Sequence, residues 1–352
     1  MRKLLIPILM LALLLTGCSS WLDGEYHSVK PHASDGIKLP EDVVTVSSYQ
    51  QVRDALEEMV ISGKLKSTFY IDGFDLETAD QYVNTAVNHV LQNSAVGAYA
   101  VEEIKYESGT SGGAAAIAVE VIYRHGRQEI LRIKNVENME NVKALLGQAI
   151  KNCDPSVVIK VNKYTAMDVE LFVQEYANTN PNLCMEIPQV TTNIYPENGE
   201  ERVMEISFLY TNGRDALKNM QSIVFPIFSA AELYVQGSEN AQQKYEQLYA
   251  FLMERFDYTI ESSITPTYSL LRYGVGDSKA FALVYNCMCK NANLQCWVVS
   301  GTRNGEAHYW NKIRYDNTEF HIDLLACNEA GEFLIMRPEE MSGYVWDYSG
   351  DQ

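Results

Sequence analysis

The chain has 352 residues, with 46 acidic side chains against 28 basic ones and a formal net charge of −18. A surface this acidic repels phosphate backbones, so we exclude nucleic acid as a partner. Beyond the N-terminal segment no apolar run approaches membrane-spanning length, and the remaining chain is long enough for two or three domains.

The first 18 residues have the layout of a secretory signal. A basic pair at residues 2–3 precedes an apolar run of roughly a dozen residues, too short to span a bilayer as a stable helix. The run ends in Leu-Thr-Gly-Cys at 15–18, which resembles the bacterial lipoprotein signal, whose cysteine becomes the lipidated first residue of the mature chain. We therefore expect an extracytoplasmic protein, held at the cell surface by membrane lipid on Cys18. The alternative is an uncleaved membrane anchor with an incidental cysteine.

Residues 19–45 contain two prolines, scattered glycine and no hydrophobic periodicity. This composition is typical of a flexible tether between the lipid and the folded body.

The six cysteines after Cys18 form no metal-site pattern. Cys287 and Cys289 lie in an expected helix, where residues two apart point about 200° away from each other and cannot hold one metal. We interpret the six cysteines as buried small apolar residues rather than disulfides, and expect neither a metal nor a cofactor.

Residues 46–133 and 134–220 are interpreted as two copies of one α-β-α-β-β module. The closing strands match best, because 119-VEVIYRHGR-127 aligns with 206-ISFLYTNGR-214 at an offset of 87 residues. Neither copy carries a catalytic constellation, which favours spacers or binding surfaces over enzymes. The expected elements are helices at 48–61, 77–92, 139–151 and 167–178, and strands at 67–74, 98–106, 114–124, 156–164, 184–195 and 202–211.

Residues 221–352 are expected to form a third domain. We interpret 221–236 as a connection, whereas apolar side chains at helical spacing predict a helix over 241–255. In 274-GVGDS-278 the glycines permit a sharp turn, and Asp277 is a good N-cap for a helix that begins at Ser278. A nucleophile at that position would lie at the positive end of the helix macrodipole.

Three strands are expected in this domain, over 295–301, 308–315 and 319–325. The last two flank Asp316-Asn317, which we interpret as a two-residue hairpin loop. The resulting register predicts one apolar face as the core, with Tyr309, Ile313 and Tyr315 opposite Leu324, Ile322 and Phe320. The aromatic-rich tail, 338–352, is expected to pack over the sheet edge or to line a cleft.

The opposite face of the hairpin carries a candidate catalytic pair. His308 is a diagonal neighbour of Asp323, within side-chain reach. A carboxylate so placed can hold an imidazole in one tautomer and stabilise its charged form. His321, on the same face, is expected to meet solvent or Glu319.

Taken together, these motifs resemble the transglutaminase-like superfamily over about residues 241–325. The resemblance implies a papain-like cysteine-histidine-aspartate triad, with the site helix packed on an antiparallel sheet. It assigns His308 as the base and Asp323 as the residue that orients it, while Ser278 stands where the family's cysteine belongs. The residues that carry the resemblance are Phe256, Tyr258, Gly274, Gly276, the strand Cys296–Gly301, His308, Trp310, Asn311 and Asp323. Trp310 and Asn311 are also candidates for a cleft lining.

Ser278 has three interpretations: a non-catalytic remnant, a serine nucleophile driven by His308 and Asp323, or an ordinary residue at a helix start. The leading hypothesis is a degenerate cleft that binds a peptide or cell-wall-associated ligand. One alternative is an amide or ester hydrolase or acyltransferase that uses Ser278, and another is a purely structural surface lipoprotein. The fold expected for all three is α+β, with duplicated modules followed by a transglutaminase-like domain.

Overall fold

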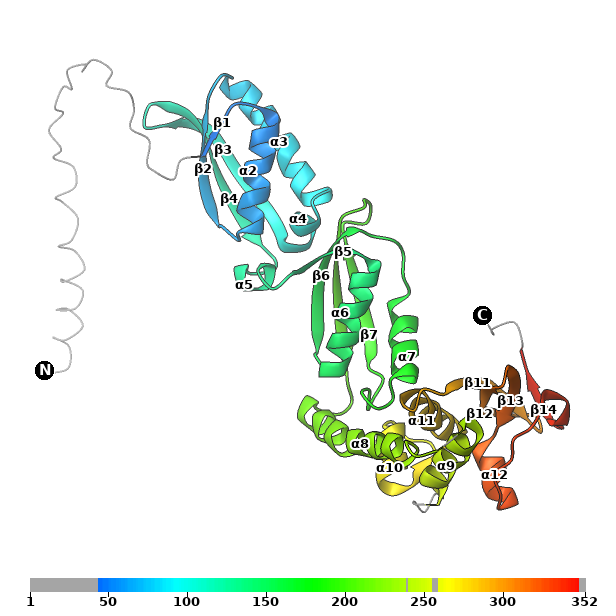
Figure 1. Cartoon of the computed structure of the whole chain (residues 1–352). Coiled ribbons are helices and arrows are strands. Elements are labelled where there is room, and N and C mark those ends of the chain that lie inside the picture. The colour runs from blue at the N-terminus through cyan, green and yellow to red at the C-terminus, as the bar shows by residue number, and fades with distance from the viewer. Residues whose placement is uncertain (1–43, 239, 255–258, 348–352) are drawn as a thin grey trace, which may run out of the picture.

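A computed structural model of the chain describes residues 44–238, 240–254 and 259–347. Two sheet modules and a C-terminal domain follow one another along the molecule (Figure 1). Cys18, the signal segment and nearly all of the expected tether lie outside the described residues. Within the described part of the chain, no helix combines the length and the apolar character that crossing a bilayer requires.

The first module is a four-stranded sheet with α2 and α3 on one face (Figure 1). The strand order is β1-β2-β4-β3, in which β1 and β2 are parallel and the other pairs antiparallel. Side-chain caps from Ser48 and Asp75 start the two long helices, and the helices and sheet enclose a core around Leu56 and Phe69. The elements are β1 (Val44–Val46), α2 (Tyr49–Ile61), β2 (Lys66–Ile71), α3 (Leu76–Gln92), α4 (Ala95–Ala100), β3 (Val101–Ser111), β4 (Ala114–Tyr123) and α5 (Arg127–Ile130).

The second module has the same architecture, with strand order β5-β6-β8-β7 and the same pattern of parallel and antiparallel pairs. Asn138 and Asp168 cap its helices, and its core surrounds Leu146 and Ile159. The elements are β5 (Lys134–Asn138), α6 (Met139–Asn152), β6 (Ser156–Lys163), α7 (Val169–Thr179), β7 (Gln189–Tyr195) and β8 (Arg202–Leu209). The two sheets have the same strand order. That the two modules arose by internal duplication stays a prediction.

The sequence-based description of the modules was incomplete in two respects. Each module begins with a strand that was not expected, β1 or β5, because these strands are short and lie at a sheet edge. Part of the strand expected at 98–106 is helical instead. Ser94 caps α4 there, and a Cβ on Gly97 would overlap the Val90 backbone, so only glycine lets α4 pack this closely on α3.

The interpretation of 221–236 as a connection was also wrong, because these residues belong largely to the long helix α8 (Arg214–Tyr234). Pro226 interrupts the pattern in the sequence, yet the buried side chains Leu217, Val224 and Phe228 follow helical spacing. The N-terminal part of α8 is fastened to the second module, since Lys218 Nζ donates to the Lys151 carbonyl at 2.7 Å.

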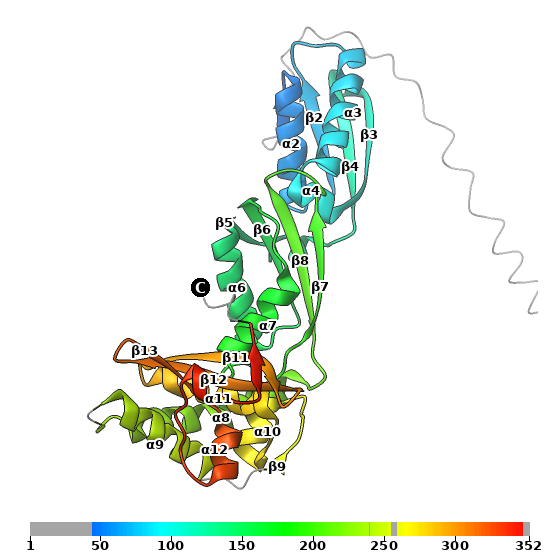
Figure 2. The ribbon, with the colours of Figure 1, turned by 90° about the vertical axis from the view of Figure 1, so that its right-hand side faces the viewer.

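The C-terminal domain packs α11 against one face of an antiparallel sheet of order β13-β12-β11-β14 (Figure 2). Its core includes Tyr285, whose hydroxyl donates to the Tyr245 carbonyl at 2.8 Å, together with Phe281 and Ile313. The elements are α9 (Ala241–Met253), β9 (Thr259–Ile260), α10 (Pro266–Tyr273), β10 (Val275–Gly276), α11 (Ser278–Asn291), β11 (Gln295–Arg303), β12 (Glu306–Tyr315), β13 (Thr318–Ile322), α12 (Leu324–Ala330), the 3-10 helix η1 (Pro338–Glu340) and β14 (Tyr344–Trp346). The α+β class and the site helix on an antiparallel sheet are as the sequence predicted.

The hairpin register is the predicted one, with Lys312 opposite His321 and Arg314 opposite Glu319. Two details differ. The strand expected at 319–325 ends at Ile322, because Asp323 caps α12. The face opposite the core is not left to solvent either, because β14 adds to the edge of β11 and lays its aromatic side chains over it.

His321 shows the consequence of that cover. Its side chain is buried, and its Nδ1 accepts a hydrogen bond from Trp310 Nε1 at 2.9 Å. The expectation that His321 meets solvent or Glu319 was therefore wrong.

Candidate active site

Ser278 is the first residue of α11, at the end of a tightly built turn. Gly274 adopts a positive φ of 68° and ends α10, a conformation that favours glycine. Asp277 then caps α11, because its Oδ1 accepts the Ala280 N–H at 2.8 Å. The sequence predicted this cap and this helix start, which place a half-buried Ser278 at the positive end of the helix.

The Ser278 hydroxyl is held by the neighbouring strand. Its Oγ accepts a hydrogen bond from the Tyr309 backbone N–H on β12 at 3.2 Å. Among the described residues, no hydrogen bond joins Ser278 to the His308 ring. The hydroxyl is therefore positioned by main chain rather than by the histidine.

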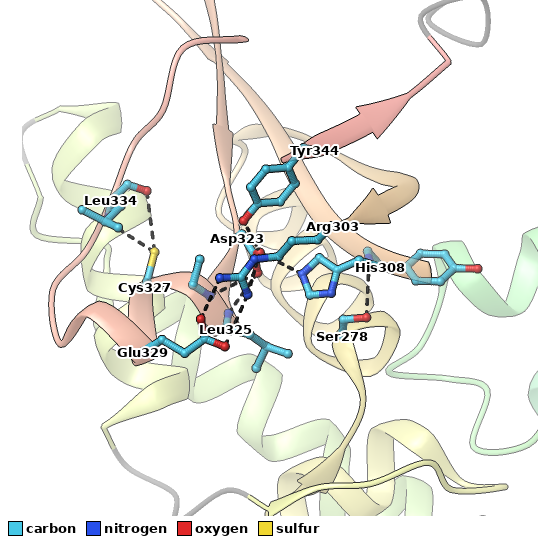
Figure 3. A network of polar contacts seen from close by, with 11 residues as sticks. Ser278, Arg303, His308, Asp323, Leu325, Cys327, Glu329, Leu334 and Tyr344 are labelled. Carbon is cyan, nitrogen blue, oxygen red and sulfur yellow. Dashed lines mark hydrogen bonds and ion pairs between the residues drawn. The ribbon is translucent and has the colours of Figure 1, made fainter. Parts of the chain in front are cut away.

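His308 and Asp323 form the pair that the hairpin register predicted. His308 Nε2 lies 2.8 Å from Asp323 Oδ2, and Figure 3 shows the imidazole between Asp323 and Ser278. When the neutral ring donates its Nε2–H to the carboxylate, the lone pair is on Nδ1, at the other edge of the ring. The pair therefore presents an oriented base on the Ser278 side.

Asp323 is only 1% exposed and uses both carboxylate oxygens. Oδ1 caps α12 by accepting the Leu325 and Ala326 N–H groups at 3.1 and 3.4 Å, and Oδ2 accepts His308 and the Tyr344 hydroxyl, the latter at 2.7 Å. Burial by itself raises the pKa of this carboxyl, but the hydrogen bonds from His308 and Tyr344 outweigh it, so the pKa lies below its ordinary value. Asp323 is thus an ionised, fully partnered carboxylate that fixes the imidazole.

Tyr344 and Arg303 complete this network and were not identified from the sequence. Tyr344 comes from β14, which pairs with β11, and the Arg303 guanidinium lies 3.8 Å from Asp323 Oδ2 while forming a bidentate pair with Glu329 (Figure 3). The aromatic-rich tail was the only signal in the sequence. The tail was expected to pack over a sheet edge. In the structure it also brings the Tyr344 hydroxyl to Asp323, to which it donates a hydrogen bond.

Trp310 and Asn311 do not line a cleft, since both side chains are fully buried. Trp310 packs against Tyr344 and Trp346, with ring centroids 5.2 and 5.5 Å away. Asn311 Nδ2 donates to the Ala282 carbonyl at 2.9 Å and so ties β12 to α11. Both residues support the site by holding its strand in place.

The cysteines offer no replacement for a thiol at position 278. All six in the described ranges are buried and free of disulfides. Burial raises the pKa of Cys287 to about 11, and the pKa of Cys289 lies well above its ordinary value for the same reason. Within residues 44–347, described except for 239 and 255–258, no group of three or more histidine, cysteine or carboxylate side chains is placed to hold a metal ion.

Comparison with known proteins gives a family for the C-terminal domain. Residues 229–323 match the model of the transglutaminase-like superfamily, which confirms the resemblance inferred from the sequence. Comparison with curated proteins gives no match.

Three solved structures are similar to the chain at low identity. One, described as a TGase, has 10% identity and a TM-score of 0.26 over 62% of this chain, which spans 63% of that protein's length. A protein described as a cysteine protease from Cytophaga hutchinsonii has 9% identity and a TM-score of 0.26, over 45% of this chain and 70% of its own. A protein described as a protease from Parabacteroides distasonis has 10% identity and a TM-score of 0.24, over 73% of this chain and 39% of its own.

Proposed function

We propose that the transglutaminase-like domain of this protein binds a peptide or cell-wall-associated ligand without catalysing a reaction on it. The observation that carries this proposal is the hydrogen bond from the Tyr309 N–H to Ser278 Oγ at 3.2 Å, made where the family places its cysteine. The base and its orienting acid are retained beside a hydroxyl that is held by main chain.

The chemistry of serine supports a non-catalytic role. An alkoxide is not accessible near neutral pH, so a serine nucleophile needs a base that takes its proton during attack. Such a base has to be within hydrogen-bond reach of the hydroxyl. In the described part of the chain the Ser278 hydroxyl is bonded to Tyr309 and not to the His308 ring. A cysteine would depend less on this contact, because the helix end and a nearby imidazolium favour a thiolate.

The retained groups suit binding. The first N–H groups of a helix have no intrahelical partner and attract carbonyl oxygens and anions. At α11 the Asp277 side chain satisfies the N–H of Ala280, which leaves the N–H groups of Ser278 and Lys279 at the helix end. His308, whose side chain is 12% exposed, adds a ring nitrogen next to them. A peptide group fits this set, because its carbonyl accepts from the N–H groups at the helix end and its N–H donates to the lone pair of His308 Nδ1.

A second candidate function, amide or ester hydrolysis or acyl transfer by Ser278, is favoured by one observation. The His308–Asp323 contact of 2.8 Å keeps Nδ1 available as a base on the side of the hydroxyl. A serine triad would require the Ser278 side chain to leave Tyr309 and donate to the His308 ring.

Two variants separate these functions, Ser278→Ala and Ser278→Cys, each compared with the native mature chain. We expect a fluorophosphonate probe to leave the native chain unlabelled, and native and Ser278→Ala proteins to co-sediment equally with purified peptidoglycan or to bind the same members of a peptide panel. Labelling, or cleavage of peptide amides or esters, that disappears in Ser278→Ala would refute the non-catalytic proposal. A native chain that binds none of these ligands would refute the binding proposal.

The thiol variant tests whether the site geometry is intact. We expect Ser278→Cys to react with iodoacetamide at pH 6 at least about tenfold faster than the Ser278→Cys/His308→Ala double variant, because the imidazole stabilises the thiolate. The buried native thiols serve as the internal control, since they should remain unmodified in the folded chain. Equal rates in the two variants would show that His308 does not act on position 278.

We also propose that Cys18 carries the lipid that holds the protein outside the cytoplasm. The support is the apolar run that ends in Leu-Thr-Gly-Cys at 15–18. Replacing Cys18 by serine should abolish metabolic labelling with a radioactive fatty acid. A Cys18→Ser protein that is still labelled, or a native protein that is not, would contradict the proposal.

A further inference from the structure

One oxygen atom of the site carboxylate serves three donors. Asp323 Oδ2 lies 2.8 Å from His308 Nε2 and accepts the Tyr344 hydroxyl at 2.7 Å. Arg303 Nη1 lies 3.8 Å from the same oxygen, and Figure 3 shows the three side chains around the carboxylate. Tyr344 lies beyond residue 323, where the match to the transglutaminase-like family ends, so the matched segment does not include it.

Tyr344 can act only as a donor in this network. Asp323 has a lowered pKa and is ionised, so its oxygens only accept hydrogen bonds. Burial, and after it the hydrogen bond to the carboxylate, raises the pKa of Tyr344, so the phenol keeps its proton at neutral pH. The Tyr344 hydroxyl therefore takes up part of the negative charge of Oδ2, the oxygen that also meets the imidazole.

Arg303 acts on the same oxygen through its charge. Its guanidinium is held by a bidentate pair with Glu329 at 3.3 and 2.6 Å, which balances part of that charge. The pair places an arginine, which stays protonated in proteins, beside Asp323. An imidazolium at His308 would bring a second positive charge to this oxygen, and like charges disfavour each other there.

The other titratable side chains around His308 come from three elements, and in the described ranges none of them is bonded to the imidazole. They are Asp277 and Lys279 at the start of α11, His321 on β13 and the exposed Glu306 on β12. Asp277 caps α11, the Lys279 ammonium lies 5.6 Å from the centre of an aromatic ring of β12, and His321 accepts from an indole N–H at 2.9 Å. The charge of the imidazole is therefore balanced at the carboxylate that it contacts.

We propose that Tyr344 and Arg303 are positioning residues that hold His308 in its neutral form, because they take up charge of Asp323 that would otherwise stabilise an imidazolium. A neutral imidazole keeps a lone pair at Nδ1 for the N–H of a ligand, whereas an imidazolium has donors only. A catalytic triad needs the imidazolium, and the same charge balance disfavours it. This inference rests on the proposed function, because it explains how the retained base serves as a hydrogen-bond acceptor.

The test measures the reactivity of a thiol placed beside the imidazole in the mature chain. In the Ser278→Cys protein the introduced thiol and the imidazole share a proton, and iodoacetamide reacts with the thiolate. Stabilising the imidazolium enlarges the fraction of thiolate. At pH 7 we therefore expect an added Tyr344→Phe substitution to speed alkylation by about 3–10-fold for one hydrogen bond. Arg303→Gln should speed it at least about twofold, since solvent screens part of the charge.

Two further measurements show whether the effect passes through the imidazole. At pH 10 an ordinary thiol, with a pKa of about 8.5, is ionised without an imidazolium, so the rates of all variants should agree within about twofold. A structural loosening would instead expose the thiol and raise the rate at both pH values. Adding His308→Ala should remove the effect of Tyr344→Phe at pH 7.

The C-terminal domain offers a matched control for each substitution. Tyr273→Phe removes a hydroxyl from an exposed side chain. Arg314→Gln removes the charge of another arginine that pairs with a glutamate, six residues from His308 along β12. Both should leave the rate at pH 7 unchanged. The native thiols, all buried in the described ranges, should stay unmodified and so show that each variant is folded.

Equal or slower alkylation at pH 7 after either substitution would overturn the inference. An increase that persists without His308, or that is as large at pH 10 as at pH 7, would overturn it as well. Should Tyr344→Phe expose the native thiols, Arg303→Gln alone decides the test, because it leaves the aromatic packing of β14 in place.

The outcomes separate this inference from the function on which it rests, because the alkylation rates require no ligand. If the rates change as expected and the native chain binds neither peptides nor peptidoglycan, the proposed function fails and the charge assigned to His308 stands. If peptides or peptidoglycan bind and the rates do not change, the inference fails and the proposed function stands.

Discussion

Tyr344→Phe removes one oxygen atom from the buried network around Asp323. The Tyr344 hydroxyl donates to Asp323 Oδ2 at 2.7 Å, and the carboxylate is 1% exposed, so water does not replace the lost donor. A hydrogen bond to a charged group contributes about 1.5–3 kcal/mol. Because His308 and the N–H groups of Leu325 and Ala326 keep their bonds to the same carboxylate, we expect a loss within that range rather than collapse of the domain.

The effect should depend on pH in a defined direction. The folded-state pKa of Asp323 is lowered, so its ionised form contributes stability that is present above the unfolded pKa of about 3.9 and is lost as the pH falls through the folded value. Tyr344→Phe removes an interaction that lowers this pKa. The difference in stability between native and variant proteins should therefore be complete at pH 7 and decrease only below about pH 4.

Urea unfolding followed by tryptophan fluorescence measures this loss in the right domain. Three of the four tryptophans, at 297, 310 and 346, belong to the C-terminal domain. With a denaturant slope of about 1–3 kcal/mol per molar urea, a loss of about 1.5–3 kcal/mol should move the transition of this domain down by roughly 0.5–3 M. Tyr273→Phe, on an exposed side chain of the same domain, is the control and should not move it. A Tyr344→Phe midpoint equal to that of the control would refute the reasoning.

Two further substitutions test the cover that β14 forms over the site. A Cβ on Gly301 would overlap the Val345 carbonyl oxygen, so Gly301→Ala should loosen β14 and speed its amide hydrogen exchange at least about tenfold. Gly109→Ala is the control: its Cβ meets open space, so amide exchange should change neither in the first module nor in β14. Trp310→Ala empties a fully buried position and should cost about 3–5 kcal/mol in thermal unfolding followed by circular dichroism, with Trp310→Phe costing clearly less. Unchanged exchange in the first variant, or equal losses in the last two, would contradict the packing described for this face.

Local sequence patterns were sufficient where the structure depends on neighbouring residues. Asp277 caps α11 by accepting the N–H of Ala280, three residues further along the chain. Asp316-Asn317 closes a hairpin whose register follows from the length of the loop. From these two local features the sequence placed Ser278 at a helix start and brought His308 to Asp323. The helix cap and the hairpin each involve residues that lie close together along the chain, so a short stretch of sequence is sufficient to predict them.

The remaining features depend on segments that meet only in the folded chain. Tyr344 reaches Asp323 because β14 adds to the far edge of the sheet, and Asn178 lines one cavity with Lys279 because the second module packs against α11. The sequence by itself determined the kind of site and its base, because caps and hairpins are encoded locally. Only the tertiary structure decided that Lys312 and His321 on the polar hairpin face are buried, that the serine hydroxyl bonds to Tyr309, and that Asp277 and Lys279 line a cavity. Those outcomes depend on which surfaces of distant segments pack together and are removed from water. The spacing of residues within one segment does not specify this packing.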